Sequence, residues 1–229
     1  TWDNRIVIDY GIANQKDQEF TRKTNDRFEL SSLVGKEIKQ TPWYYSFFLN
    51  ARTQLTSGYD FGEDEDGNPI RTETTKILSP GYFQAGLGML WKKSDNLKLN
   101  IAPATARLII VNSQFTNVGQ VQSAIDAFNQ IGYFGVKANE TSRFEFGAAI
   151  GGYGKFTLSK NIVMENVLNL YSNYLEDLKN VDIDYTISLV MSVNKWITAN
   201  IAFQAIYDDN AVKGFQIREA LGVGLTYGF

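Results

Sequence analysis

The sequence predicts an all-β protein, an antiparallel up-and-down transmembrane β-barrel of about ten strands. Three observations favour this fold class. Apolar and polar residues alternate with a period of two over long runs, the connections between the runs are alternately short and long, and the tryptophans gather at one end of the predicted strands. The runs cover about ten residues or more, whereas a strand of a soluble protein usually has about five or six and a strand that crosses a bilayer needs roughly 9–11.

The alternation defines each strand in turn. It is clearest where Ile183, Tyr185 and Ile187 share one phase while Asp184 and Thr186 share the other. Runs of the same kind begin at residues 43, 197 and 221, and they make one face of each strand apolar. The predicted strands form one domain, residues 1–229, and are in order Trp2–Ala13, Asp26–Gly35, Pro42–Ser57, Ser79–Lys92, Leu97–Val111, Ser142–Leu158, Ile162–Leu175, Val181–Val193, Trp196–Tyr207 and Phe215–Phe229.

The connections alternate in length. Those after the second, fourth, sixth and eighth strands are short, for example Ser94–Asn96 and Ser159–Asn161. The others are longer, and two of them, Gly58–Leu78 and Asn112–Thr141, are the longest. In outer-membrane barrels the short turns face the periplasm and the long loops face the exterior. We therefore expect a protein of the outer membrane that crosses it many times, with both termini in the periplasm.

Aromatic residues support the same orientation. All four tryptophans open or close a predicted strand at the short-turn end, where an amphipathic ring lies at the level of the lipid headgroups. The chain ends on an aromatic residue, as the assembly signal of bacterial outer-membrane proteins does. The predicted girdle at this end is Trp2, Trp43, Trp91, Trp196, Tyr227 and Phe229, and candidates for the opposite girdle are Tyr59, Tyr174, Tyr207 and Phe215.

Composition excludes several kinds of function. The chain contains no Cys and no His, so it has no thiolate nucleophile, no imidazole base and no sulfur-based zinc site. Its net charge of −3 gives no bulk attraction to nucleic acid. Glu145 and Glu165 are the carboxylates on which an acid–base enzyme would depend. We expect no enzyme activity, no cofactor and no resident metal.

Several segments resemble an uncharacterised family of outer-membrane β-barrels from Bacteroidota, known as a domain of unknown function. The resemblance covers nearly the whole chain and implies fold and location but no activity. Members of the family carry a signal peptide and a further hairpin upstream, which implies about twelve strands in an intact barrel. The matching segments are Trp2-Asp3-Asn4, Arg22-Lys23-Thr24-Asn25-Asp26, Trp43-Tyr44-Tyr45-Ser46, Asn50-Ala51-Arg52-Thr53-Gln54, Ser172-Asn173-Tyr174, Tyr207-Asp208-Asp209 and Gly222-Val223-Gly224-Leu225.

If the apolar phase faces lipid, the other phase lines the lumen. This phase carries both signs of charge, which predicts either a lattice of ion pairs filling a narrow barrel or a polar conduit that the arginines bias towards anions. The predicted lumen residues are Arg5, Asp9, Arg27, Glu29, Arg52, Lys98, Arg143, Glu145, Lys155, Glu165, Asp184 and Arg218.

Two loops carry further patterns. The acidic segment Asp60–Asn68 faintly resembles a calcium loop but lacks the spaced ligands and the distal glutamate, which favours a solvated loop. In the loop Asn112–Thr141, Val121, Ile125 and Phe128 have the spacing of an amphipathic helix. The apolar stripe of this helix either caps the barrel mouth or contacts a partner protein.

These observations lead to two hypotheses for function. The first is an integral outer-membrane barrel without catalytic activity, acting as a structural or accessory subunit of a larger outer-membrane assembly. The alternative is a narrow channel or transporter for small polar or anionic solutes. The expected partners are outer-membrane lipid, lipopolysaccharide and other outer-membrane proteins, and not nucleic acid.

Overall fold

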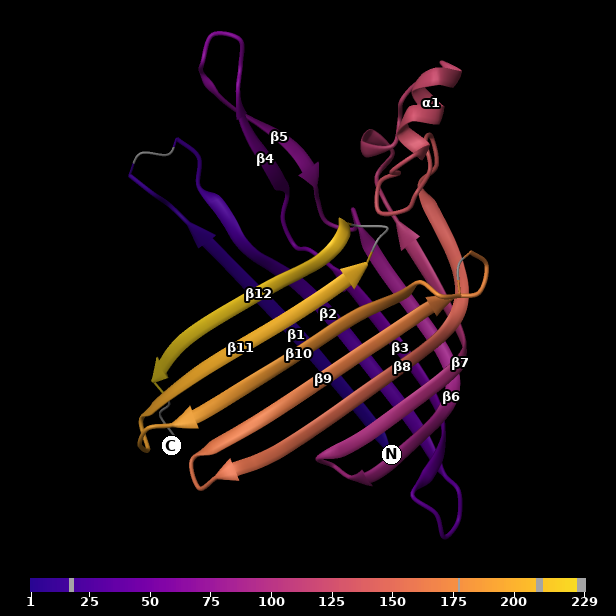
Figure 1. Cartoon of the computed structure of the whole chain (residues 1–229), viewed down its shortest axis with the longest axis vertical. Coiled ribbons are helices and arrows are strands. Elements are labelled where there is room, and N and C mark those ends of the chain that lie inside the picture. Colours follow the sequence, from indigo (N-terminus) through magenta and orange to yellow (C-terminus); the bar gives the residue numbers. More distant parts are fainter. Residues whose placement is uncertain (17–18, 177, 209–211, 226–229) are drawn as a thin grey trace.

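A computed structural model describes residues 1–16, 19–176, 178–208 and 212–225 of the chain. Within this part of the chain, ten strands form one antiparallel sheet, and each strand pairs with the next one along the sheet (Figure 1). The fold class that the sequence predicts is confirmed. The strands in sheet order are β1 (Trp2–Ala13), β2 (Arg22–Glu37), β3 (Trp43–Thr53), β6 (Gly81–Ser94), β7 (Leu97–Ile110), β8 (Ser142–Ser159), β9 (Ile162–Asn173), β10 (Val181–Ser192), β11 (Ile197–Asp208) and β12 (Val212–Leu225).

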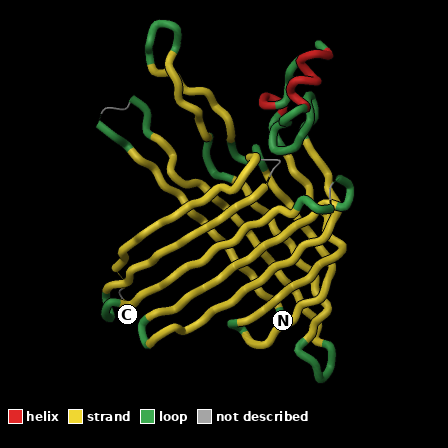
Figure 2. The backbone as a smooth tube through the Cα atoms, viewed as in Figure 1, coloured by secondary structure: helices red, strands yellow, loops and turns green. Residues whose placement is uncertain are grey.

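The sheet curls into a half-barrel that is not closed by backbone pairing (Figure 2). Strands β8 to β12 form one wall, and β1, β2, β3 and β6 form the wall behind it (Figure 1). Among the described residues, β1 pairs only with β2 and β12 pairs only with β11, so each contributes one open edge.

The two ends of the half-barrel differ as the loop lengths predict. The first strand begins and the last strand ends at the short-turn end (Figure 1). Trp43 pairs with Trp91 across β3 and β6 at this end, and Trp2 and Trp196 lie beside the starts of β1 and β11. The opposite end carries the long loops with the short helix α1 (Gln122–Asn129) and the 3-10 turn η1 (Ser113–Phe115). No helix within the described ranges is long and apolar enough to cross a membrane.

A small hairpin in the loop between β3 and β6 was not predicted. Its strands β4 (Gly58–Glu63) and β5 (Pro69–Thr75) pair only with each other and project beyond the long-loop end of the sheet (Figure 1). As a result β3 ends at Thr53 rather than at the predicted Ser57. The chain leaves the sheet there because the side chain of Asp26 on β2 accepts hydrogen bonds from the backbone N–H groups of Leu55 and Thr56 (2.7 and 2.9 Å).

The outer face of the sheet is apolar and exposed. Leu49 on β3, Leu87 on β6, Phe144 on β8 and Leu221 on β12 expose 51%, 62%, 60% and 76% of their surface. A protein dissolved in water rarely leaves a continuous apolar face of this extent uncovered. The charged residues of the opposite phase point inward, and the inner face holds the small apolar cluster of Phe48, Ala102, Ala149 and Tyr171.

A β-bulge in β7 reverses the phase of that strand. The register with β8 shifts between Ala102 and Thr105, and that with β6 shifts between Ile101 and Ala104. Both shifts surround Pro103, which has no N–H group to donate to the ladder. Lys98 and Asn100 face inward before the bulge, and Arg107 faces inward after it. The backbone of β7 at the bulge lies close to Gly88 on β6, where an added Cβ would lie 2.1 Å from the carbonyl oxygen of Ile101. An unbroken alternation would have placed Arg107 on the apolar face.

Candidate functional site: the charged inner face

The inner face encloses a cavity of about 850 Å³ whose lining comes from strands on both walls. Its polar lining alternates along each strand with the outward apolar residues, so the cavity follows directly from the two-residue period. The polar and charged residues that line it include Asp3, Arg5, Arg27, Glu29, Asn50, Arg52, Gln84, Lys98, Asn100, Arg107, Glu165, Asn169, Asp182 and Asp184.

A buried charge cluster joins β7, β8 and β10. The guanidinium of Arg107 on β7 lies 3.4 Å from the carboxylate of Glu145 on β8 and 2.5 Å from that of Asp182 on β10. Glu145 also lies 2.9 Å from Nε of Arg143, which in turn pairs with Glu176 in the loop after β9. The side chain of Glu145 is only 1% exposed. Its charge is compensated by the two arginines rather than by water.

Ion pairs also join strands that are not neighbours in the sheet. Arg52 on β3 lies 3.4 Å from Asp184 on β10, which also accepts a hydrogen bond from Gln204 (2.8 Å). Lys98 on β7 lies 2.6 Å from Asp3 on β1. Because Arg52 and Asp184 come from opposite walls, their side chains meet across the interior.

Aromatic rings occupy part of the interior as well. The guanidinium of Arg107 lies 3.6 Å from the ring centroid of Tyr171, and that of Arg52 lies 4.9 Å from the centroid of Tyr82. Tyr171 packs against Phe48 in the inner cluster. Each arginine is thus stacked on a ring and paired with carboxylates, which fixes its position by two independent contacts.

Most of the predicted lumen residues lie in charge pairs, and seven of the twelve line the cavity. Besides the clusters above, the pairs are Arg27–Glu29, Lys155–Glu165 at 2.8 Å and Arg218–Asp9 at 3.3 Å. Eleven of the twelve predicted residues take part in an ion pair. Arg5 lines the cavity, and no ion pair is found for it among the described residues.

Several charged residues that line the cavity were not predicted, among them Asp3, Arg107 and Asp182. Asp182 is in phase with Asp184, so the alternation itself contained the signal for it. Arg107 could be found only by locating the bulge, for which Pro103 within an otherwise regular strand was the available signal. Of the predicted aromatic girdle, Tyr227 and Phe229 lie outside the described residues. Tyr59 lies in the projecting hairpin, where Arg71 stacks on it at 4.6 Å, rather than in the wall.

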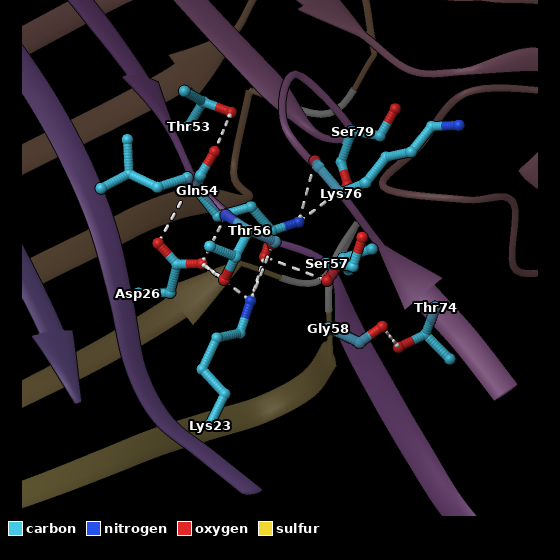
Figure 3. A network of polar contacts seen from close by, with 12 residues as sticks. Lys23, Asp26, Thr53, Gln54, Thr56, Ser57, Gly58, Thr74, Lys76 and Ser79 are labelled. Carbon is cyan, nitrogen blue, oxygen red and sulfur yellow. Dashed lines mark hydrogen bonds and ion pairs between the residues drawn. The ribbon is translucent and has the colours of Figure 1, made fainter. Parts of the chain in front are cut away.

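A polar network holds the β3–β6 loop against the long-loop rim (Figure 3). Lys23 on β2 donates hydrogen bonds to Asp26 (2.9 Å) and to the backbone carbonyl of Thr56 (3.0 Å). The amide of Gln54 donates to the carbonyls of Lys76 and Ser79 (3.1 and 3.0 Å). The contacts join the loop to β2 and to the loop's own strand ends, so the network has a structural role.

The acidic segment forms the tip of the β4–β5 hairpin. Asp64 Oδ1 accepts hydrogen bonds from the backbone N–H groups of Asp66 and Asn68 (3.0 and 2.8 Å), and Gly67 has a positive φ of 80°. The side-chain amide of Asn68, which donates to Asp64 Oδ2 at 3.1 Å, and these backbone bonds hold the pKa of the Asp64 carboxyl below its usual value. Within the described residues, no group of three or more acidic side chains is arranged to hold a metal ion.

The loop between β7 and β8 docks on the rim through its second half. Val136 is 1% exposed and packs against Ile109 and Val111 at the end of β7. Tyr133 donates a hydrogen bond to the carbonyl of Thr74 (2.5 Å) and stacks on Phe115 at 5.1 Å.

Helix α1, in contrast, stands above the ends of β7 and β8 (Figure 1). Of the residues predicted to contact a partner, Val121 is 64% exposed while Ile125 and Phe128 are half-buried. The prediction that this stripe contacts another protein remains a prediction.

The chain is similar in part to a protein family and to a solved porin structure. Residues 1–59, which include β1, β2 and β3, match a family described as a protein of unknown function (DUF3078). This is a smaller part of the chain than the sequence resemblance covers. One solved structure, described as the NanC porin in a rhombohedral crystal form, is similar at 12% identity and a TM-score of 0.35, over 88% of this chain and 94% of that chain. No curated protein matches the sequence.

Proposed function

We propose that the chain is an integral outer-membrane protein of the β-barrel type that acts as a non-catalytic structural or accessory subunit of a larger assembly. The exposed apolar face supports the membrane location, because a bilayer removes that face from water. Outer-membrane strands run antiparallel and number an even total, as these ten do. Both termini then lie in the periplasm, at the short-turn end. Membership of the Bacteroidota family over the whole chain is part of this proposal.

The observation that carries the non-conducting role is the set of ion pairs across the interior. Arg107–Asp182 and Arg52–Asp184 each join strands that are separated in the sheet by at least two others. Long charged side chains that meet in this way occupy the path that a solute would take. A lattice of paired charges is also costly to open, since removing one partner leaves a buried charge uncompensated.

Planar-bilayer conductance tests this role. The refolded full-length chain is expected to give no step currents, and Arg52→Ala is expected to give none either, because the other ion pairs remain. Folding of each sample is checked beforehand by whether its migration on a gel changes on heating. Currents from the wild-type chain would refute the non-conducting role. Purification from outer membranes in mild detergent tests the accessory role, which requires co-purifying proteins in stoichiometric amount.

One observation favours the narrow conduit as a second candidate. The cavity of 850 Å³ is large enough for small solutes, and Arg5, Arg27 and Arg52 line it. An arginine-lined pore favours anions. If the chain is such a conduit, the wild-type protein conducts with a preference for chloride over potassium, and Arg52→Ala reduces that preference.

A further inference from the structure

The four short connections of the sheet, at the end opposite helix α1, are rich in lysine (Figure 1). Together they form the short-turn rim, which consists of residues 36–42, 92–96, 159–161 and 193–196. Six lysines and two carboxylates lie in this rim, a net charge of +4, although the whole chain has a net charge of −3. Every one of the four connections contributes at least one lysine, and the six are Lys36, Lys39, Lys92, Lys93, Lys160 and Lys195.

The long-loop end has the opposite sign of charge. The tip of the β4–β5 hairpin carries four consecutive carboxylates, from Glu63 to Asp66. Since the rim has a charge of +4 and the whole chain −3, the rest of the chain carries the balance of −7. A surface with a field of one sign attracts ligands of the other sign, so the rim favours anions.

The chain's own carboxylates leave most of the rim lysines unpaired. Lys92 lies 2.8 Å from Asp95, and among the described residues this is the one ion pair of the rim. The other carboxylate, Glu37, lies in the inner phase of β2, whereas Lys36 follows the exposed Val34 in the outer phase. The five lysines without an ion pair in this part of the structure are all exposed, and they are Lys36, Lys39, Lys93, Lys160 and Lys195.

The rim lysines lie beside the tryptophans of the same end. Trp91 directly precedes Lys92, and Trp196 directly follows Lys195, whose Nζ lies 5.0 Å from the centroid of the indole ring. Tryptophan at a membrane interface lies at the level of the lipid headgroups, and a lysine there extends its ammonium group into the headgroup layer. In a bilayer the rim therefore brings its cations to the depth of the lipid phosphates.

The rim does not depend on the open edges of the sheet. Its connections join β2 to β3, β6 to β7, β8 to β9 and β10 to β11, and each of these strands pairs with a neighbour on both sides. Whatever lies beside β1 or β12 leaves these four connections and their lysines in place.

We propose that the short-turn rim binds the headgroups of anionic phospholipids in the leaflet on that side, in preference to zwitterionic ones. The exposed ammonium groups pair with the headgroup phosphates, and an anionic headgroup, unlike a zwitterionic one, carries no cation that repels the lysines. An acidic partner beyond the membrane fits less well, because the lysines lie beside the interfacial tryptophans and not on a projecting loop. This inference rests on the proposed membrane location.

Quenching of tryptophan fluorescence by brominated lipids tests the preference. The full-length chain is reconstituted in phosphatidylcholine bilayers that contain increasing fractions of brominated phosphatidylglycerol or of brominated phosphatidylcholine. All four tryptophans lie at the short-turn end, so the quenching reports on lipid at the rim. Brominated phosphatidylglycerol is expected to bind about five-fold more tightly, as contact with one lysine predicts. Raising the salt concentration from about 0.1 M to about 1 M should reduce this ratio, because it shortens the screening length from about 10 Å to about 3 Å.

Matched variants locate the effect. Replacing the five exposed rim lysines together by glutamine is expected to bring the ratio of the two affinities to about one, whereas replacing the same five by arginine should keep it, because arginine retains the charge. Lys16→Gln combined with Lys137→Gln removes two exposed lysines from the long-loop end and is also expected to keep the ratio. Folding of each variant is checked by whether its migration on a gel changes on heating.

Three outcomes would contradict the proposal in different ways. Equal quenching of the wild-type chain by the two lipids would overturn it and leave the membrane location in place, and this is the result expected if the rim binds an acidic protein instead. A ratio that persists in the glutamine variant would overturn it too, because the rim lysines would not be the cause. Absence of quenching by either lipid would refute the membrane location and the proposal with it.

Discussion

Replacing Arg107 by methionine removes the central charge of the inner face while keeping a long apolar stem. The guanidinium lies 3.4 Å from Glu145 and 2.5 Å from Asp182, and the three side chains are only 13%, 1% and 17% exposed. The variant therefore leaves two poorly solvated carboxylates with less compensation, although Arg143 still lies beside Glu145. Breaking a buried ion pair by removing one partner costs about 3–5 kcal/mol. We expect a loss of folding free energy of about 3 kcal/mol or more.

Lys155→Met is the matched control on the same face. Lys155 lies 2.8 Å from Glu165, closer than Arg107 lies to Glu145, but the two side chains are 41% and 33% exposed. A solvated pair contributes about 0–1 kcal/mol. The comparison isolates burial, since both substitutions exchange a cation for methionine.

Urea titration in detergent micelles, followed by fluorescence of the four tryptophans, measures both free energies of unfolding. Combining Arg107→Met with Glu145→Gln and Asp182→Asn should recover part of the loss, because the uncompensated carboxylates are then neutral. If Arg107→Met destabilises the chain no more than Lys155→Met does, water solvates the inner cluster and the argument for a closed interior fails.

Three further outcomes are expected. Ser57 and Gln114 hold the pKa of Glu73 below its usual value, so this carboxylate stabilises the contact between β5 and the β7–β8 loop above its unfolded pKa. That contribution is lost as the pH falls through the lowered folded pKa of Glu73. Limited proteolysis should therefore cut the β7–β8 loop faster at low pH, and Glu73→Gln should abolish this pH dependence. Gly147→Ala should destabilise the sheet by about 3 kcal/mol, because the added Cβ would lie 1.9 Å from the carbonyl oxygen of Ser172. Gly151→Ala on the same strand is the control: its added Cβ would lie 3.8 Å from the nearest atom, so this variant should unfold at the same urea concentration as wild type. Val136→Ala should cost about 1.5–3 kcal/mol and release the β7–β8 loop to protease, and an unchanged digestion rate would show that the loop is held by its polar contacts instead.

The two-residue period predicted the wall of the half-barrel because each face of every strand meets a single environment. Asp184 on β10 and Glu165 on β9 could be assigned to the inner face from their phase alone, and both line the cavity. Pairing partners could not be predicted, because Arg52 and Asp184 are 132 residues apart in sequence and meet only when the sheet curls. The two-residue alternation predicts the face of the strand on which a side chain lies, but not the residue that the side chain contacts.

The bulge in β7 shows where phase alone fails. One irregularity at Pro103 exchanges the two faces, so the same alternation that places Lys98 correctly misplaces Arg107. Two features of the sequence accompany the bulge: a proline within a strand and Gly88 on the neighbouring strand, where only a glycine leaves room for the displaced backbone. The buried cluster around Glu145 thus depends on the β-bulge, because the bulge turns Arg107 inward.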